Sequence, residues 1–91
     1  MTVTIGHITF DSVHYDAGGD VLYLHVGEAR NAVDFDESPE GHALRFDAHG
    51  NLIGLTIVNA KWLLDKYGKV SITMPERVEV GPDALRAALA A

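Results

Sequence analysis

The chain contains no cysteine, no cluster of lysine or arginine, and no long apolar run. Without cysteine it can have neither a disulfide framework nor a thiolate metal site. Its formal net charge is −6, from seven basic and thirteen acidic residues. Because binding to a phosphate backbone depends on clustered cations, we expect no nucleic-acid partner.

No apolar stretch reaches the roughly 18 residues that a membrane-spanning helix requires. The first residues also lack the basic-then-apolar pattern of a secretion signal. We therefore expect a soluble, cytoplasmic protein without membrane contact. Its 91 residues predict a single domain, residues 1–91, whose core is modest enough for self-association to help it.

Residues 42–64 read as a strand, a tight turn, a second strand and a helix. A three-residue loop that pairs Asp47 with Asn51 would set Arg45 opposite Ile53, because the loop fixes the register. The same register sets Phe46 opposite Leu52 and Leu44 opposite Gly54. Residues 52–58 are apolar on both faces, which is typical of a central strand covered on both sides.

A helix is predicted to follow this strand. Asn59 is a plausible N-cap, since its side chain can accept a hydrogen bond from the first turn. The helix should run to Tyr67 and end at Gly68 in a left-handed cap. We expect Trp62 and Leu63 to anchor it, because eight residues are too few for a stable isolated helix.

Residues 2–26 predict the first hairpin. The alternation of residues 2–15 changes phase near Asp11 and Ser12, which suggests a β-bulge within one strand. If Tyr15 pairs with Asp20, Val13 faces Leu22. The shared apolar face would then hold Val13, Tyr15, Leu22, Leu24 and Val26.

An acidic group follows in a short half-exposed strand and loop: Asp34, Asp36, Glu37 and Glu40. These side chains could bind a divalent cation or a basic partner. Carboxylates also keep a sheet edge from aggregating, and we favour that solvated-edge interpretation because no ordered ligand spacing accompanies them.

The C-terminal part, residues 69–91, predicts strands over 69–74 and 77–80 and then a helix. Pro82 suits the first position of that helix. Leu85, Ala88 and Leu89 form its apolar stripe, which could pack on the chain's own sheet or on another subunit.

Five histidines are dispersed without the i,i+4 spacing of a helical zinc motif. His14 and His25 could share one sheet face, and either could form an acid–base pair with a nearby Asp. No nucleophile or phosphate-loop motif is present. We expect no enzyme, no metal and no cofactor, and keep a small enzyme or metal binder using His14 or His25 as an alternative.

The segments YDAGGDVLYL (residues 15–24), FDAHGNLIGL (46–55) and IVNA (57–60) resemble a family of short prokaryotic proteins, domain of unknown function 2283. The resemblance covers roughly residues 13–64. Thr56 stands where that family usually has Glu, and Lys61 where it often has Ser. The resemblance implies a small α+β fold without assigned activity, and it carries a hint of an antitoxin-like role.

We therefore predict an α+β fold: a small antiparallel sheet built from two β-hairpins in a meander, one helix packed on it, and a short C-terminal strand and helix. One short helix cannot cover both faces of the central strand. We therefore expect the C-terminal helix or another subunit to cover the second face. We expect a homodimeric, non-catalytic interaction or assembly module. An antitoxin-like partner of a basic toxin is an alternative. The interaction residues would be Asp34, Asp36, Glu37, Glu40, Trp62, Leu85 and Leu89.

Overall fold

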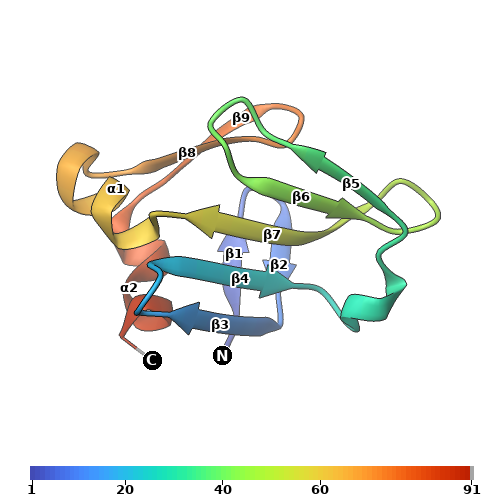
Figure 1. The fold of residues 1–91 in the computed structure, drawn as a ribbon, viewed down its shortest axis with the longest axis horizontal. Helices are drawn as coiled ribbons and strands as arrows, with labels where there is room; N and C mark the ends of the chain where they lie inside the picture. Colours follow the sequence, from blue (N-terminus) through green and yellow to red (C-terminus); the bar gives the residue numbers. More distant parts are fainter. Residues whose placement is uncertain (91) are drawn as a thin grey trace.

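The computed structural model describes residues 1–90 and has an α+β fold around a five-stranded antiparallel sheet (Figure 1). In spatial order its strands are β3 (Ser12–Asp16), β4 (Val21–His25), β7 (Leu52–Val58), β6 (Ala43–Phe46) and β5 (Asp34–Glu37). The predicted fold class is confirmed, and β7 is the central strand as expected.

Two separate hairpins and two helices complete the fold. The hairpins are β1 (Val3–Ile5) with β2 (Ile8–Phe10), and β8 (Val70–Thr73) with β9 (Arg77–Val80). The helices are α1 (Ala60–Tyr67) and α2 (Pro82–Leu89), and a 3-10 turn, η1, spans Ala29–Asn31. Both C-terminal strands and the helix that begins with Pro82 confirm the prediction for this region.

The core lies on one face of the sheet. The β1–β2 hairpin passes behind it in Figure 1, while α2 contacts β1 and β3 and α1 contacts β8. The fully buried large side chains include Ile5, Phe10, Leu22, Leu24, Leu55, Ile57, Ile72 and Leu85. The C-terminal helix therefore packs within its own chain, on the same side as both added hairpins.

The N-terminal segment differs from the expected bulged strand. Gly6, with φ of 61°, turns the chain between β1 and β2, and these strands pair with each other. After Asp11 the chain enters the main sheet as β3. The phase change near Asp11 is thus the point where the chain leaves a two-stranded ribbon for a different sheet.

For the first hairpin, the prediction of which side chains face the core is correct, but the predicted strand register is wrong. Tyr15 pairs with Leu22, and Val13 pairs with Leu24. The loop is one turn of four residues that ends at Asp20, which adopts a left-handed backbone with φ of 55°. Because the register differs from the expected one by two residues, the same side chains still face the core.

The second hairpin begins as predicted and then departs. The Asp47 amide donates to the Asn51 carbonyl over 2.9 Å, and Phe46 pairs with Leu52. A β-bulge at Arg45 and Phe46 then shifts the register, so that Leu44 pairs with Leu55 rather than with Gly54. This shift places Leu44 on the core face beside the buried Leu55.

Helix α1 ends as predicted but is anchored by other residues. Gly68 has φ of 74°, and its amide donates to the Leu64 carbonyl over 2.8 Å. The prediction that Trp62 anchors this helix is wrong, since the residue is 51% exposed. Ala60 and Leu64 are the buried residues of this helix, and the other predicted anchor, Leu63, is only partly buried.

Candidate functional site

The sheet face opposite the core is the first candidate site, here called the open face. The strand register aligns its side chains in two rows that cross all five strands. One row consists of Glu37, Ala43, Thr56, Tyr23 and His14. The other consists of Phe35, Arg45, Gly54, His25 and Ser12. No element within residues 1–90 forms a layer over this face (Figure 1).

Apolar side chains remain accessible on the open face. Tyr23 is 40% exposed and its ring stacks on that of His14, with centroids 6.0 Å apart. Val58, which pairs with Val21 at one end of the face, is 39% exposed. Phe35 is 66% exposed on the edge strand, where the Arg45 guanidinium lies 5.9 Å from its ring centroid.

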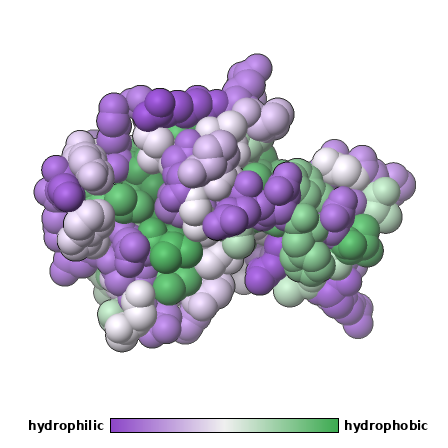
Figure 2. Space-filling model, turned by 45° about the horizontal axis from the view of Figure 1, so that its top comes forward, coloured by the Kyte–Doolittle hydropathy of each residue, from purple (hydrophilic) through white to green (hydrophobic). Residues whose placement is uncertain are grey.

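Hydrophobic surface also gathers next to the edge strand. Figure 2 shows it at the end of the molecule where η1 leads into β5. Val33 and Phe35 are exposed there. The apolar edge thus continues from the open face around the start of β5.

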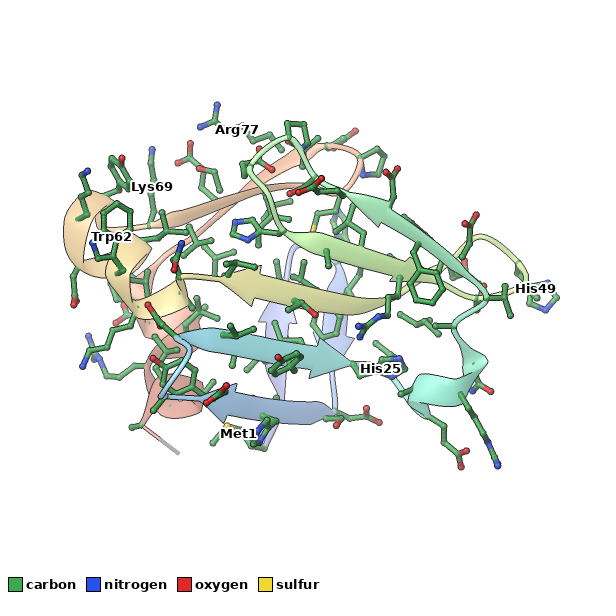
Figure 3. The ribbon with its side chains drawn as sticks, viewed as in Figure 1. Met1, His25, His49, Trp62, Lys69 and Arg77 are labelled. Carbon is green, nitrogen blue, oxygen red and sulfur yellow. The ribbon has the colours of Figure 1, made fainter. Side chains whose placement is uncertain are left out.

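The middle of the second row is tightly packed. A Cβ atom on Gly54 would lie 3.0 Å from Arg45 Cβ and 3.2 Å from His25 Cδ2. His25 is buried at the end of β4 (Figure 3), with Nδ1 3.3 Å from the Gly27 carbonyl oxygen. Glycine at position 54 therefore lets the Arg45 and His25 side chains approach β7 closely.

The two histidines considered for catalysis occupy different rows of the open face. His14 pairs with Tyr23, whereas His25 pairs with Ser12. His14 is exposed and His25 is buried. Within residues 1–90, no three His, Asp or Glu side chains are grouped closely enough to hold a metal ion.

The predicted acidic group separates into two parts. Asp34, Asp36 and Glu37 lie on β5, all exposed. Glu40 instead reaches β8, where it accepts hydrogen bonds from the Thr73 amide over 2.9 Å and the Thr73 hydroxyl over 2.8 Å. Desolvation would raise the pKa of Glu40, but the hydrogen bonds outweigh it and lower the pKa to about 2.

The other predicted interaction residues lie on the helices. Trp62 is exposed on α1, where Lys66 Nζ lies 4.6 Å from its ring centroid. On α2, Leu85 is fully buried in the core and Leu89 is partly buried. In this arrangement a partner could contact Trp62 but has no access to Leu85.

A polar corner at the start of α1 was missed by sequence reasoning. Asp20 accepts hydrogen bonds from the Lys61 amide over 2.8 Å and the Trp62 amide over 3.0 Å. Asn59 occupies the N-cap position as predicted, but the predicted side-chain bond is wrong, because its backbone is left-handed and its side chain makes no cap bond. Since Asp20 lies 41 residues before Lys61, no local pattern indicates this cap.

Tyr15 completes the corner. Its hydroxyl donates to Asp20 Oδ1 over 2.7 Å. That hydrogen bond, followed by desolvation, raises the pKa of Tyr15 to about 12. Desolvation would raise the pKa of Asp20, but the hydrogen bonds from Tyr15 and the two α1 amides lower it overall.

A cleft is the second candidate site, and it too was missed. It has a volume of about 270 Å³ and lies between α1, the loop before β6, and the β8–β9 hairpin. Its lining consists of Glu40, His42, Leu63, Tyr67, Lys69, Val70, Ser71 and Arg77. The alternation of the extended segment 69–73 does place Lys69 and Ser71 on one face, but only the folded chain brings His42 beside them.

A family model described as a protein of unknown function (DUF2283) matches residues 12–61, more than half of the chain. The chain belongs to the DUF2283 family. The DUF2283 match contains all five strands of the main sheet and ends at Lys61, whose amide belongs to the polar corner. Both hairpins outside the sheet, and α2, lie outside the DUF2283 match.

Neither a curated protein nor a solved structure matches the chain. Over residues 1–90, both helices are too short to cross a bilayer. The DUF2283 assignment leaves the activity open, so function has to be argued from the open face and the cleft.

Proposed function

We propose that this DUF2283 member is a non-catalytic assembly module that forms a homodimer by packing the open faces of two copies together. The observation that carries this proposal is the uncovered central sheet with exposed Tyr23 and Val58. A sheet face that carries exposed apolar side chains is commonly packed against a second layer. A second copy supplies that layer without any additional chain.

The composition of the open face supports an interface. In its first row the centre is uncharged, with Ala43, Thr56 and Tyr23, while Glu37 and His14 lie at the two ends. Interfaces commonly have this arrangement, in which charged groups are depleted at the core and a polar rim surrounds it. The four spacings between five strands give a width of about 19 Å, enough for one sheet to pack on another.

Light scattering over a dilution series tests this proposal. The wild-type chain should show twice the monomer mass at high concentration. Tyr23→Glu and Val58→Glu should give monomers, because they place charge in the proposed interface. Trp62→Glu is the matched control, since Trp62 is a still more exposed apolar residue, at 51%, but lies on α1 and not on a strand of the open face (Figure 3). A wild-type monomer at every concentration would overturn the proposal.

A second candidate is an antitoxin-like role in which the β5 edge binds a basic protein. All four residues of β5 are exposed, and among residues 1–90 Asp34, Asp36 and Glu37 form no ion pair. Calorimetric titration with a lysine-rich peptide tests this role. Binding should weaken in the Asp34→Asn, Asp36→Asn double variant and with added salt. Equal binding by the double variant would reject the role.

A further inference from the structure

We propose that the cleft between α1, the loop before β6 and the β8–β9 hairpin binds a small organic oxyanion, a carboxylate or phosphate that carries an apolar group. None of the residues that line the cleft belongs to the open face. The cleft could therefore be occupied whether or not two copies associate.

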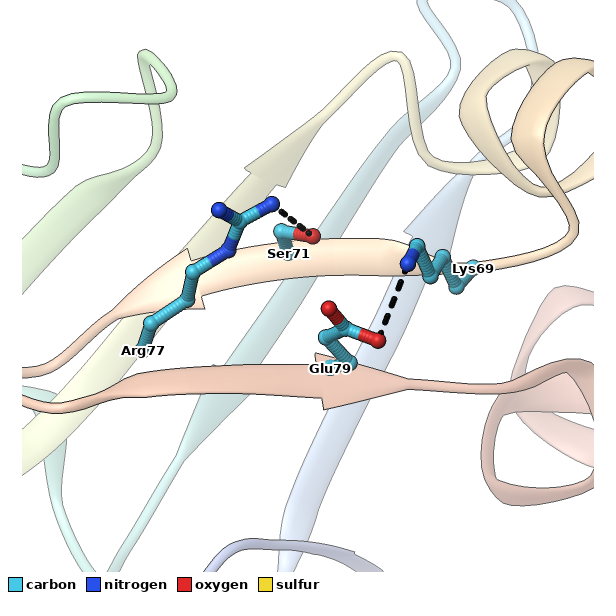
Figure 4. A network of polar contacts seen from close by, with 4 residues as sticks. All are labelled: Lys69, Ser71, Arg77 and Glu79. Atoms are coloured by element: carbon cyan, nitrogen blue, oxygen red, sulfur yellow. Dashed lines mark hydrogen bonds and ion pairs between the residues drawn. The ribbon is translucent and has the colours of Figure 1, made fainter.

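Two cations of the hairpin supply the first part of the site. Arg77 Nη2 donates to Ser71 Oγ over 3.3 Å, and Lys69 Nζ donates to Glu79 over 3.0 Å (Figure 4). Within residues 1–90 Arg77 forms no ion pair. Most of the donors of its planar guanidinium thus remain available for a carboxylate or phosphate, which this group binds in bidentate fashion.

His42 supplies a buried donor. Its ring lines the cleft and is only 1% exposed. Nδ1 accepts a hydrogen bond from the Val58 amide over 3.2 Å, so in the neutral ring the proton lies on Nε2. Burial lowers the pKa of His42 and favours that neutral ring.

This Nε2 atom has no hydrogen-bond partner among residues 1–90. A buried donor without a partner costs free energy, and such groups are rare in folded proteins. An oxygen atom of a bound ligand would supply the missing acceptor.

The charge balance limits the kind of anion. Glu79 is paired with Lys69, and both carboxylate oxygens of Glu40 are bound by Thr73. The two cations are thus partly offset by two carboxylates. A ligand with one small anionic group fits this balance better than a polyanion does.

The remaining wall of the cleft is apolar. Leu63 and Tyr67 of α1 and Val70 of β8 line it. A volume of about 270 Å³ is near the lower end of ligand pockets, so the ligand should be small. An aromatic or short aliphatic body attached to the oxyanion would contact these side chains.

Two-dimensional ¹H–¹⁵N NMR titration tests the inference with benzoate and phenyl phosphate as probes. Benzamide is the control ligand, since it keeps the ring but lacks the charge. At least one anion should shift the amide signals of His42, Ser71 and Arg77 saturably, with an affinity at least about tenfold above that of benzamide. Comparing the two anions then distinguishes a carboxylate ligand from a phosphate ligand.

Matched variants link such binding to the cleft. Arg77→Gln should lower the affinity of the cleft for the anion at least about tenfold. Arg30→Gln should not, because Arg30 is an exposed residue of η1 paired with Glu28. Ser71→Ala provides a second cleft variant that leaves the buried His42 in place. Failure of both anions to saturate, equal binding of benzamide, or unchanged affinity in Arg77→Gln would overturn the inference.

Discussion

The Tyr15 hydroxyl donates a hydrogen bond to Asp20 Oδ1 over 2.7 Å, at the end of the turn that joins β3 to β4. The same carboxylate accepts hydrogen bonds from the first amides of α1. Asp20 therefore acts as the N-terminal cap of a helix that is distant in sequence. This corner fixes α1 to the sheet even though Trp62 packs little of its surface.

Asp20→Asn should lower the free energy of unfolding by about 1–2 kcal/mol, since it weakens charged hydrogen bonds at a helix N-terminus. Asparagine also tolerates the left-handed backbone of this position, so backbone strain should not contribute to the measured change in unfolding free energy. Urea denaturation measures the change. Asp65→Asn, on the exposed side of the same helix, should change stability by less than about 0.5 kcal/mol. Equal effects of the two changes would contradict the capping role.

Protonation of Glu40 should lower the stability of the fold in acid. Its pKa lies at about 2 in the folded protein, below the ordinary value near 4.5. A carboxyl with a lowered pKa stabilises the fold above its unfolded pKa, and that contribution is lost as pH falls from about 4.5 to 2. Thermal unfolding across this pH range should show a smaller loss for Glu40→Gln than for Glu76→Gln. Identical pH profiles would mean that the Thr73 contacts do not stabilise the charged form.

Gly54→Ala should destabilise the sheet by about 1–3 kcal/mol. The added methyl group would meet Arg45 and His25 in a crowded part of the open face. Gly18→Ala is the control, because a Cβ there makes only ordinary contact with Asp16. Chemical denaturation should show little change for the control, whereas equal stability of both variants would argue against this close approach.

Leu85→Ala should cost about 2–5 kcal/mol, because Leu85 is a fully buried core residue of α2. Leu89→Ala should cost less, since Leu89 is only partly buried. Neither change should alter the oligomeric state under conditions where the chain remains folded. Light scattering and denaturation on the same samples separate these effects, and dissociation by Leu85→Ala without loss of stability would place α2 in an interface.

The elements that the sequence predicted correctly have local signals. Gly68 ends α1 and Pro82 begins α2 because each residue suits one backbone position. The two-sided apolar pattern of residues 52–58 likewise identified the central strand.

The errors arose where distant residues decide the structure. The bulge at Arg45 depends on packing Leu44 beside Leu55, and the cap of α1 comes from Asp20. Spacing alone could not show that α2 and both outer hairpins would cover the same face. His42 was not predicted as a cleft residue because its hydrogen-bond partner, the Val58 amide, belongs to a different strand.

The most direct test of the assembly proposal is a distance measurement between two copies. The absence of native cysteine allows one nitroxide label at Glu37→Cys, on the rim of the open face. Two sheets packed about 10 Å apart should place the labels within range of pulsed dipolar spectroscopy. We expect a defined inter-label distance that disappears when Tyr23→Glu is added. Only a background decay at every concentration, with the label in place and the fold intact, would contradict dimerisation through the open face.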